Sequence, residues 1–167
     1  MSIIDVLLAE LEQEAQATER VLARVPQAHL SWRPHPKSFS LGQLARHVAT
    51  KPGNVAQLAA TDLVASPPTG VQAEVATAAE LVPKMNANIT KARELLGGFD
   101  DPAMMATWRI MAGGNEIMAM PRATLARAVM LNHWYHHRGQ LLVYLRMHDV
   151  PLPSVYGPTA DENPFAP

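Results

Sequence analysis

Two histidines four residues apart are the part of this chain best suited to chemistry. His133 and His137 lie in a stretch, from Pro121 to about His148, whose pattern predicts one long helix. Residues i and i+4 lie on the same face of a helix, so both imidazoles project in the same direction. Two neutral imidazoles on one turn are half of a site for a first-row transition metal.

A metal site inside a helical protein needs a further ligand from another helix. On a helical wheel with His133 at zero, His137 falls near about 40° and Gln140 near about −20°, on the stripe that must face the core. His47 is expected in the middle of a helix, in line with Leu44, and is therefore the favoured third ligand. Three other histidines are expected in or beside a proline-rich connector, or at a helix end: His29, His35 and His148.

The same residues also have a purely structural interpretation. A histidine on an apolar face is more often a hydrogen-bonded core residue than a metal ligand. The glutamate of a zinc-protease helix motif is absent between His133 and His137, so the pair alone favours a metal and a packed core about equally. The addition of His47 moves the balance modestly toward a metal.

Three neighbours of the pair have supporting interpretations. Gln140 is either a core amide or a hydrogen-bond donor close to a metal ligand. His136 projects about 60° away from His133, which favours a supporting or interfacial role over ligation. Arg138 faces the other side of the helix, where we expect it to bind a carboxylate or a backbone carbonyl.

The elements that position these residues are predicted to be four long amphipathic helices with short connections, hence an all-α four-helix bundle. A capping box of Ser40 and Gln43 marks the start of the second helix, and Pro52-Gly53 is expected to kink that helix. The four helices are expected to span Ser2 to about Val25, Ser40 to about Leu63, roughly Gln72 to Leu96, and Pro121 to about His148.

The remaining segments are connections and a tail. Residues 66–70 are predicted to form a loop, and residues 107–111 and 116–120 to form a small accessory β-hairpin before the last helix. The C-terminal tail, residues 150–167, is proline-rich and is expected to be extended and to pack on the bundle. The length predicts a single domain over residues 1–167.

Composition narrows the possible partners. The net charge is −1 without a run of Lys or Arg, which argues against binding to nucleic acid or to an anionic membrane. The sequence has no apolar stretch long enough to span a membrane and no signal peptide, so we expect a cytoplasmic protein. It contains no cysteine, which leaves His, Asp and Glu as the strong metal ligands.

Three strings in this sequence carry a resemblance to a known family. The most specific is the string with His133, His136-His137-Arg138-Gly139-Gln140-Leu141 and Tyr144-Leu145-Arg146. The other two are Phe39-Ser40-Leu41-Gly42-Gln43-Leu44-Ala45 with His47, and Val150-Pro151-Leu152-Pro153-Ser154-Val155-Tyr156-Gly157-Pro158-Thr159-Ala160-Asp161-Glu162. These strings resemble signatures of the DinB-like family, and the resemblance covers essentially the whole chain.

This resemblance implies a four-helix bundle with a site of three histidines for nickel, zinc or a similar divalent ion. It assigns ligand roles to His47, His133 and His137, the same three residues that the helical wheel selects. It also implies a homodimer, as in many members. Some relatives are S-transferases or isomerases that use a low-molecular-weight thiol, and others are described as metal-dependent hydrolases. Lys51, which places a cation just after His47, departs from the family pattern.

The leading hypothesis is a metal-dependent enzyme that activates a low-molecular-weight thiol or water for attack on a small electrophilic substrate. Because the chain lacks cysteine, a thiol would have to be a cosubstrate. The alternative is a non-catalytic metal-binding dimer with a structural or stress-related role.

Overall fold

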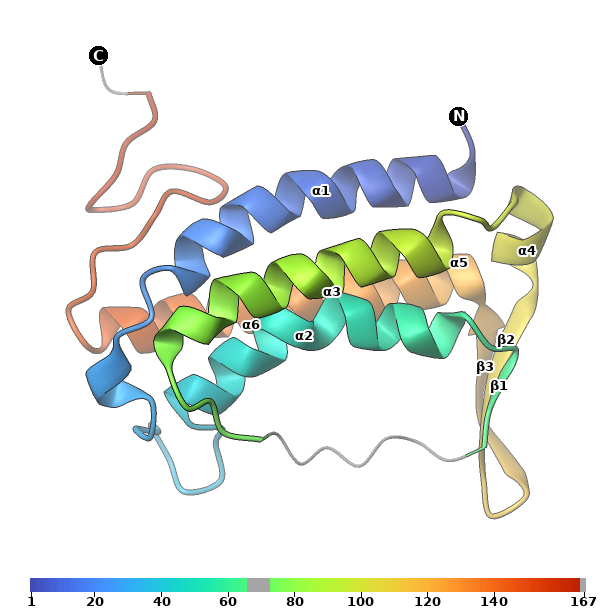
Figure 1. Cartoon of the computed structure of the whole chain (residues 1–167), viewed down its shortest axis with the longest axis horizontal. Helices are drawn as coiled ribbons and strands as arrows, with labels where there is room; N and C mark the ends of the chain where they lie inside the picture. The colour runs from blue at the N-terminus through green and yellow to red at the C-terminus, as the bar shows by residue number, and fades with distance from the viewer. Residues whose placement is uncertain (66–72, 166–167) are drawn as a thin grey trace.

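The computed structural model describes residues 1–65 and 73–165, and the chain is mostly helical (Figure 1). Its long helical segments lie side by side, and a small sheet stands at one end. The long segments are α1 (Ile3–Leu22), α2 (Leu41–Ala59), α3 (Leu81–Leu96), and a continuous run of α5 (Arg122–Thr124), the π-helical η3 (Leu125–Asn132) and α6 (His133–Arg146). The short helices are η1 (Gln27–His29), η2 (Ala78–Glu80) and α4 (Asp101–Met105).

Capping boxes set where the helices start. Ser40 and Gln43 cap the start of α2 as predicted, and Ser2 caps α1 together with Asp5. The predicted start of the third helix at Gln72 lies outside the described residues, and residues 73–77 are not helical. A capping box of Thr77 and Glu80 starts the helical structure later than expected, and α3 itself begins at Leu81.

The end of α2 is also earlier than predicted. The helix continues through Pro52 but ends at Ala59 instead of about Leu63. Side chains from outside the helix donate hydrogen bonds to two of its last carbonyl oxygens. The Arg122 guanidinium donates to the carbonyl of Ala59 at 2.9 Å, and the Trp108 indole donates to that of Leu58 at 2.9 Å. These contacts satisfy carbonyls that the end of the helix leaves without an intrahelical donor.

The sheet contains the predicted hairpin and one additional strand. β2 (Thr107–Ala112) and β3 (Asn115–Pro121) pair antiparallel, with Gly113 and Gly114 at φ 56° and 83° in the turn. Positive φ at both central residues is the geometry of the turn that suits a two-residue hairpin. The additional strand, β1 (Leu63–Val64), pairs parallel to β2 and was not predicted, because it is too short to show a pattern. The predicted loop 66–70 lies outside the described residues.

The last helical run differs from the predicted uniform α-helix. It starts at Arg122, with Pro121 as the residue before the helix, and eight of its residues, Leu125–Asn132, are π-helical. The π-helical segment ends directly before His133. A π-helix is rare and is often found at functional sites, and periodicity alone does not reveal it.

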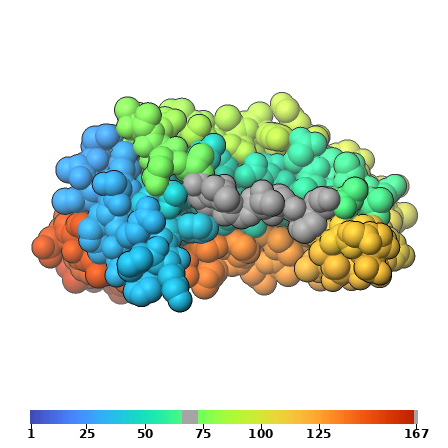
Figure 2. Space-filling view, turned by 90° about the horizontal axis from the view of Figure 1, so that it is seen from below, coloured from blue at the N-terminus to red at the C-terminus, as the bar shows by residue number. Residues whose placement is uncertain are grey.

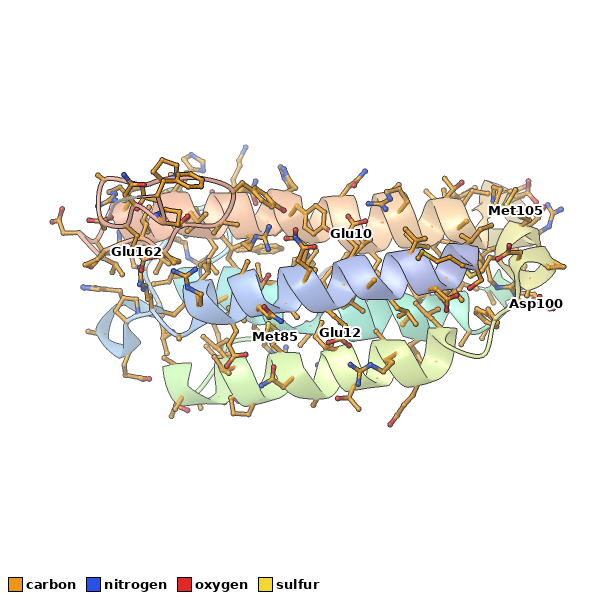
Figure 3. All side chains as sticks on the ribbon, turned by 90° about the horizontal axis from the view of Figure 1, so that it is seen from above. Glu10, Glu12, Met85, Asp100, Met105 and Glu162 are labelled. Carbon is orange, nitrogen blue, oxygen red and sulfur yellow. The ribbon has the colours of Figure 1, made fainter. Side chains whose placement is uncertain are left out.

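Helix α1 lies between α3 and the run from α5 to α6 (Figure 3). Glu10 on α1 accepts two hydrogen bonds from Arg127, both 2.6 Å, and one of 2.8 Å from the Tyr135 hydroxyl. Inside the molecule, Arg138 is 2% exposed and pairs with Glu14 at 2.7 Å, which confirms its predicted carboxylate partner. None of the helices in residues 1–65 and 73–165 is long and apolar enough to cross a membrane.

The tail, which the structure describes as far as residue 165, contacts the C-terminal half of α1. Glu162 forms ion pairs with Arg20 and Arg24, and Arg24 also donates to the carbonyl of Pro151 at 2.9 Å. Leu152 and Val155 pack against the core, whereas Tyr156 is largely exposed.

In the space-filling view, the connector between α1 and α2 lies at the end of the molecule opposite the hairpin (Figure 2).

Candidate metal centre

Three imidazoles converge between α2 and α6. His47 comes from α2, and His133 and His137 come from the first two turns of α6. One ring nitrogen of each histidine lies within 4.8 Å of the corresponding atoms of the other two, and all three residues are half-buried. The Nε2 atoms of His47 and His133 are 3.2 Å apart. Two imidazole nitrogens bound tetrahedrally to one zinc ion would be about 3.3 Å apart, so this pair has the spacing of two ligands of one ion, and the group of three could hold a metal ion.

Gln140 fixes the orientation of one of these rings. Its Oε1 lies 2.7 Å from Nδ1 of His137, one turn earlier on α6. Because a carbonyl oxygen only accepts, Nδ1 of His137 carries the proton and Nε2 keeps its lone pair. This is the arrangement in which metal-binding histidines are held by a neighbouring acceptor.

Pro52 and Trp134 join the two helices next to the cluster. Pro52 has no N–H, so the carbonyl of Val48, four residues earlier on α2, lacks its usual helical donor. The Trp134 indole donates to this carbonyl at 2.8 Å. Val48 follows His47 and Trp134 follows His133, so this buried hydrogen bond fixes the spacing between two of the three histidines.

The electrostatics of the cluster favour neutral imidazoles. Burial lowers the pKa of His133 to about 4, and the positive charge of Lys51 contributes to this shift. Burial also lowers the pKa of His137, although the hydrogen bond to Gln140 opposes the shift. At neutral pH both rings are therefore uncharged and offer a lone pair to a cation.

The other histidines lie outside this group. His136 is exposed, and its ring centre lies 5.0 Å from that of His137. His29 stacks on His148 at 4.1 Å in a separate aromatic cluster with Trp32. His35 is exposed and accepts a hydrogen bond from the backbone N–H of Lys37.

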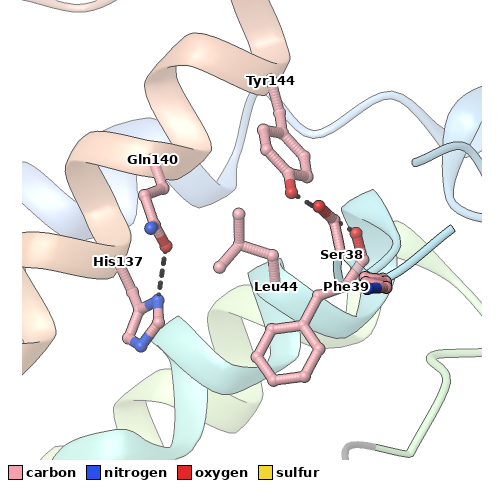
Figure 4. Close-up of a pocket in the computed structure, with 7 residues that line it drawn as sticks. Ser38, Phe39, Leu44, His137, Gln140 and Tyr144 are labelled. Carbon is pink, nitrogen blue, oxygen red and sulfur yellow. Dashed lines mark hydrogen bonds between the residues drawn. The ribbon is translucent and has the colours of Figure 1, made fainter. Parts of the chain in front are cut away.

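A cavity of about 230 Å³ adjoins the cluster at His137 (Figure 4). Its other walls come from α2, α6 and the residues just before α2. The residues before α2 were not predicted as part of the site: Lys37, Ser38 and Phe39. They lie in an irregular connector, which has no periodicity that would show where its side chains point. The cavity is lined by Lys37, Ser38, Phe39, Leu44, His137, Gln140 and Tyr144.

Comparisons with known proteins agree with this fold. The family model described as "DinB family" matches residues 1–163. The chain belongs to the DinB family. It is 27% identical over 161 residues to the uncharacterized protein YrdA of Bacillus subtilis. The match covers 95% of this chain and 91% of YrdA. The family resemblance seen in the sequence is thereby confirmed.

Two solved structures of DinB-like proteins share the DinB fold of this chain. The protein YjoA of Bacillus subtilis is 21% identical, with a TM-score of 0.68 over 89% of this chain and 96% of YjoA. A DinB-like protein of Bacillus cereus ATCC 10987 is also 21% identical, with a TM-score of 0.69 over 90% of this chain and 95% of that protein. At this level of identity the likeness extends to the fold alone.

Proposed function

We propose that this DinB-family protein binds one divalent transition-metal ion through His47, His133 and His137 and acts as an enzyme on a small electrophilic substrate. The observation that carries the proposal is the convergence of three imidazoles next to a cavity. When bound, nickel, zinc or a similar ion would act as a Lewis acid and lower the pKa of water or of a low-molecular-weight thiol.

The residues of the chain itself account for binding and orientation. Gln140 holds the His137 ring so that its Nε2 lone pair is available. Phe39, Leu44 and Tyr144 give the cavity an apolar wall for the substrate. Because the chain has no cysteine, a thiolate nucleophile would come from a cosubstrate, as in a thiol S-transferase. With water as the nucleophile, the activity would be that of a hydrolase.

We further propose that the long segments form a four-helix bundle that assembles as a cytoplasmic homodimer. The support is an exposed apolar surface on the long helices, where Val143 of α6 and Met147, the residue directly after α6, are 59% and 56% exposed. Most soluble oligomers are two-fold dimers. Light scattering should give twice the monomer mass, and a monomeric mass would refute the dimer.

The first experiment is metal analysis of protein purified without an affinity tag. We expect about one bound ion per chain, since the three imidazoles form one site. His47→Ala, His133→Ala and His137→Ala should each abolish stoichiometric binding. His136→Ala is the matched control and should keep the ion, because its side chain is exposed. Loss of the ion from His136→Ala but not from His133→Ala would show that the ligand assignment is wrong.

The second experiment identifies the nucleophile. Metal-loaded protein is assayed with several cellular thiols and a generic electrophile, and in parallel with ester and amide substrates. We expect metal-dependent thiol transfer. Hydrolysis without any thiol-dependent turnover would favour water as the nucleophile. If the ion is bound but neither reaction occurs, the protein is better explained as a non-catalytic metal-binding dimer with a structural or stress-related role.

A further inference from the structure

Lys51 places a positive charge beside the three imidazoles. It follows His47 by four residues on α2, so the two side chains leave the helix on the same face, with Cβ atoms about 6 Å apart. Its charge also acts across the helix interface, because it lowers the pKa of both His133 and His137 on α6. The ammonium group therefore belongs to the surroundings of the metal cluster.

This charge has no acidic partner among the described residues. Lys51 is half-buried, and none of the ion pairs in residues 1–65 and 73–165 includes it. Nor is a carboxylate among the groups that shift the pKa of His133 or His137. Burial without a partner disfavours the charged ammonium and lowers the pKa of Lys51.

The charge balance of the site then points to its ligand. Three neutral imidazoles add no negative charge, so a divalent ion beside Lys51 would give a strongly positive centre. Lys51 would by itself repel the ion and weaken metal binding. An anionic group on the bound small molecule would remove this repulsion and form a charge-assisted hydrogen bond with the ammonium.

We propose that Lys51 makes this site selective for a small molecule that carries an anionic group, such as a carboxylate, next to its metal-binding or reacting atom. The proposal rests on the proposed metal-binding function and specifies its substrate class. Lys51 acts here as a specificity residue: it holds the anionic group of the ligand and is not a ligand of the ion.

The test uses the full-length protein loaded with Co²⁺, whose absorption spectrum reports ligands that join the metal. Two thiols of similar size are titrated: mercaptoacetate, which carries a carboxylate, and 2-mercaptoethanol, which is neutral. The measured quantity is the ratio of their dissociation constants, and this ratio is compared between variants. The intrinsic difference between the two thiols cancels in that comparison, and tight binding of either one shows that the variant site is intact.

We expect the preference for mercaptoacetate to be about tenfold greater in the wild type than in Lys51→Met, the loss typical of a hydrogen bond between charged groups. Lys51→Arg should keep most of the preference, because the charge remains. Lys51→Met should bind Co²⁺ at least as tightly as the wild type, since a repelling charge has been removed. Lys91→Met, which removes a lysine from α3, is the matched control and should leave the ratio unchanged.

Two results would overturn the proposal while leaving the metal site intact. The first is full Co²⁺ binding with the same preference ratio in the wild type and in Lys51→Met. The second is loss of the preference in Lys37→Met but not in Lys51→Met, which would assign the anion to the cavity side of the cluster. Failure of the wild type to bind Co²⁺ would instead refute the metal centre, and this inference with it.

Discussion

The convergence of His47, His133 and His137 was predictable from the sequence because their spacing on two helices carries the information. A spacing of four residues from His133 to His137 suffices to place both rings on one face of a helix. The apolar neighbours of His47 place it on the inner face of α2. Lys37, Ser38 and Phe39 were not predictable, because they lie in an irregular connector and reach the site only through the packing of α2 against α6.

The hydrogen bond between Gln140 and His137 gives a prediction at the level of one residue. Gln140→Ala should weaken metal binding by about 10- to 100-fold, the usual effect of removing the group that orients a metal-binding histidine. The physical reason is that the His137 ring would lose the acceptor 2.7 Å from its Nδ1 and with it a fixed proton position. Competition with a chromophoric chelator measures the affinity.

Gln140→Glu is the matched control for this prediction. It keeps an acceptor oxygen at the same distance along the side chain, so it should retain most of the affinity that Gln140→Ala loses. Equal affinities of the wild type and Gln140→Ala would mean that the hydrogen bond does not orient a ligand.

At the level of the elements, local signals were predictable and tertiary ones were not. Capping residues and turn glycines act within a few positions, so the start of α2 and the hairpin followed from the sequence. The end of α2 is held by hydrogen bonds from Arg122 and Trp108, which are distant in the sequence. The π-helical Leu125–Asn132 likewise has the apolar pattern of an ordinary helix and differs in its hydrogen bonds.

The contact between Trp134 and Val48 gives a prediction for the pair of helices α2 and α6. Trp134→Phe should destabilise the protein by about 1–3 kcal/mol, because the buried Val48 carbonyl would lose its donor. It should also weaken metal binding, since this contact fixes the spacing between His47 and His133. Thermal unfolding and metal titration measure the two effects.

Trp108→Phe is the matched control, because Trp108 lies on β2 and its indole also donates to a carbonyl of α2. Trp108 is equally buried, and its indole donates to the carbonyl of Leu58, more than two turns from Val48. We expect a comparable loss of stability with unchanged metal affinity. If both variants changed the metal affinity equally, the effect of Trp134 would be one of general stability and not of positioning.

At the level of the whole molecule, the tail links α1 to the end of α6. Arg146 pairs with Asp161, Arg20 and Arg24 pair with Glu162, and the Tyr156 hydroxyl donates to Glu14 at 2.8 Å. A truncated chain that ends at Val150 should therefore melt several degrees lower, the shift that about 1–2 kcal/mol produces in a domain of this size. An unchanged melting temperature would show that the tail contacts add nothing to stability.

The same contacts predict how the contribution of the tail depends on pH. The backbone N–H of Ser154 and the side chains of Arg24 and Arg20 lower the pKa of Glu162 below its ordinary value of 4.5. A carboxyl whose pKa is lower in the folded state stabilises that state above the unfolded pKa, and the gain is lost as the pH falls through the folded pKa. Glu162→Gln should therefore lower the melting temperature at pH 7 and have progressively less effect below about pH 4.5.

Melting curves of the wild type and of Glu162→Gln between pH 7 and pH 3 measure this difference. A difference that stayed constant across this range would mean that Glu162 acts through its shape and neutral hydrogen bonds and not through its charge.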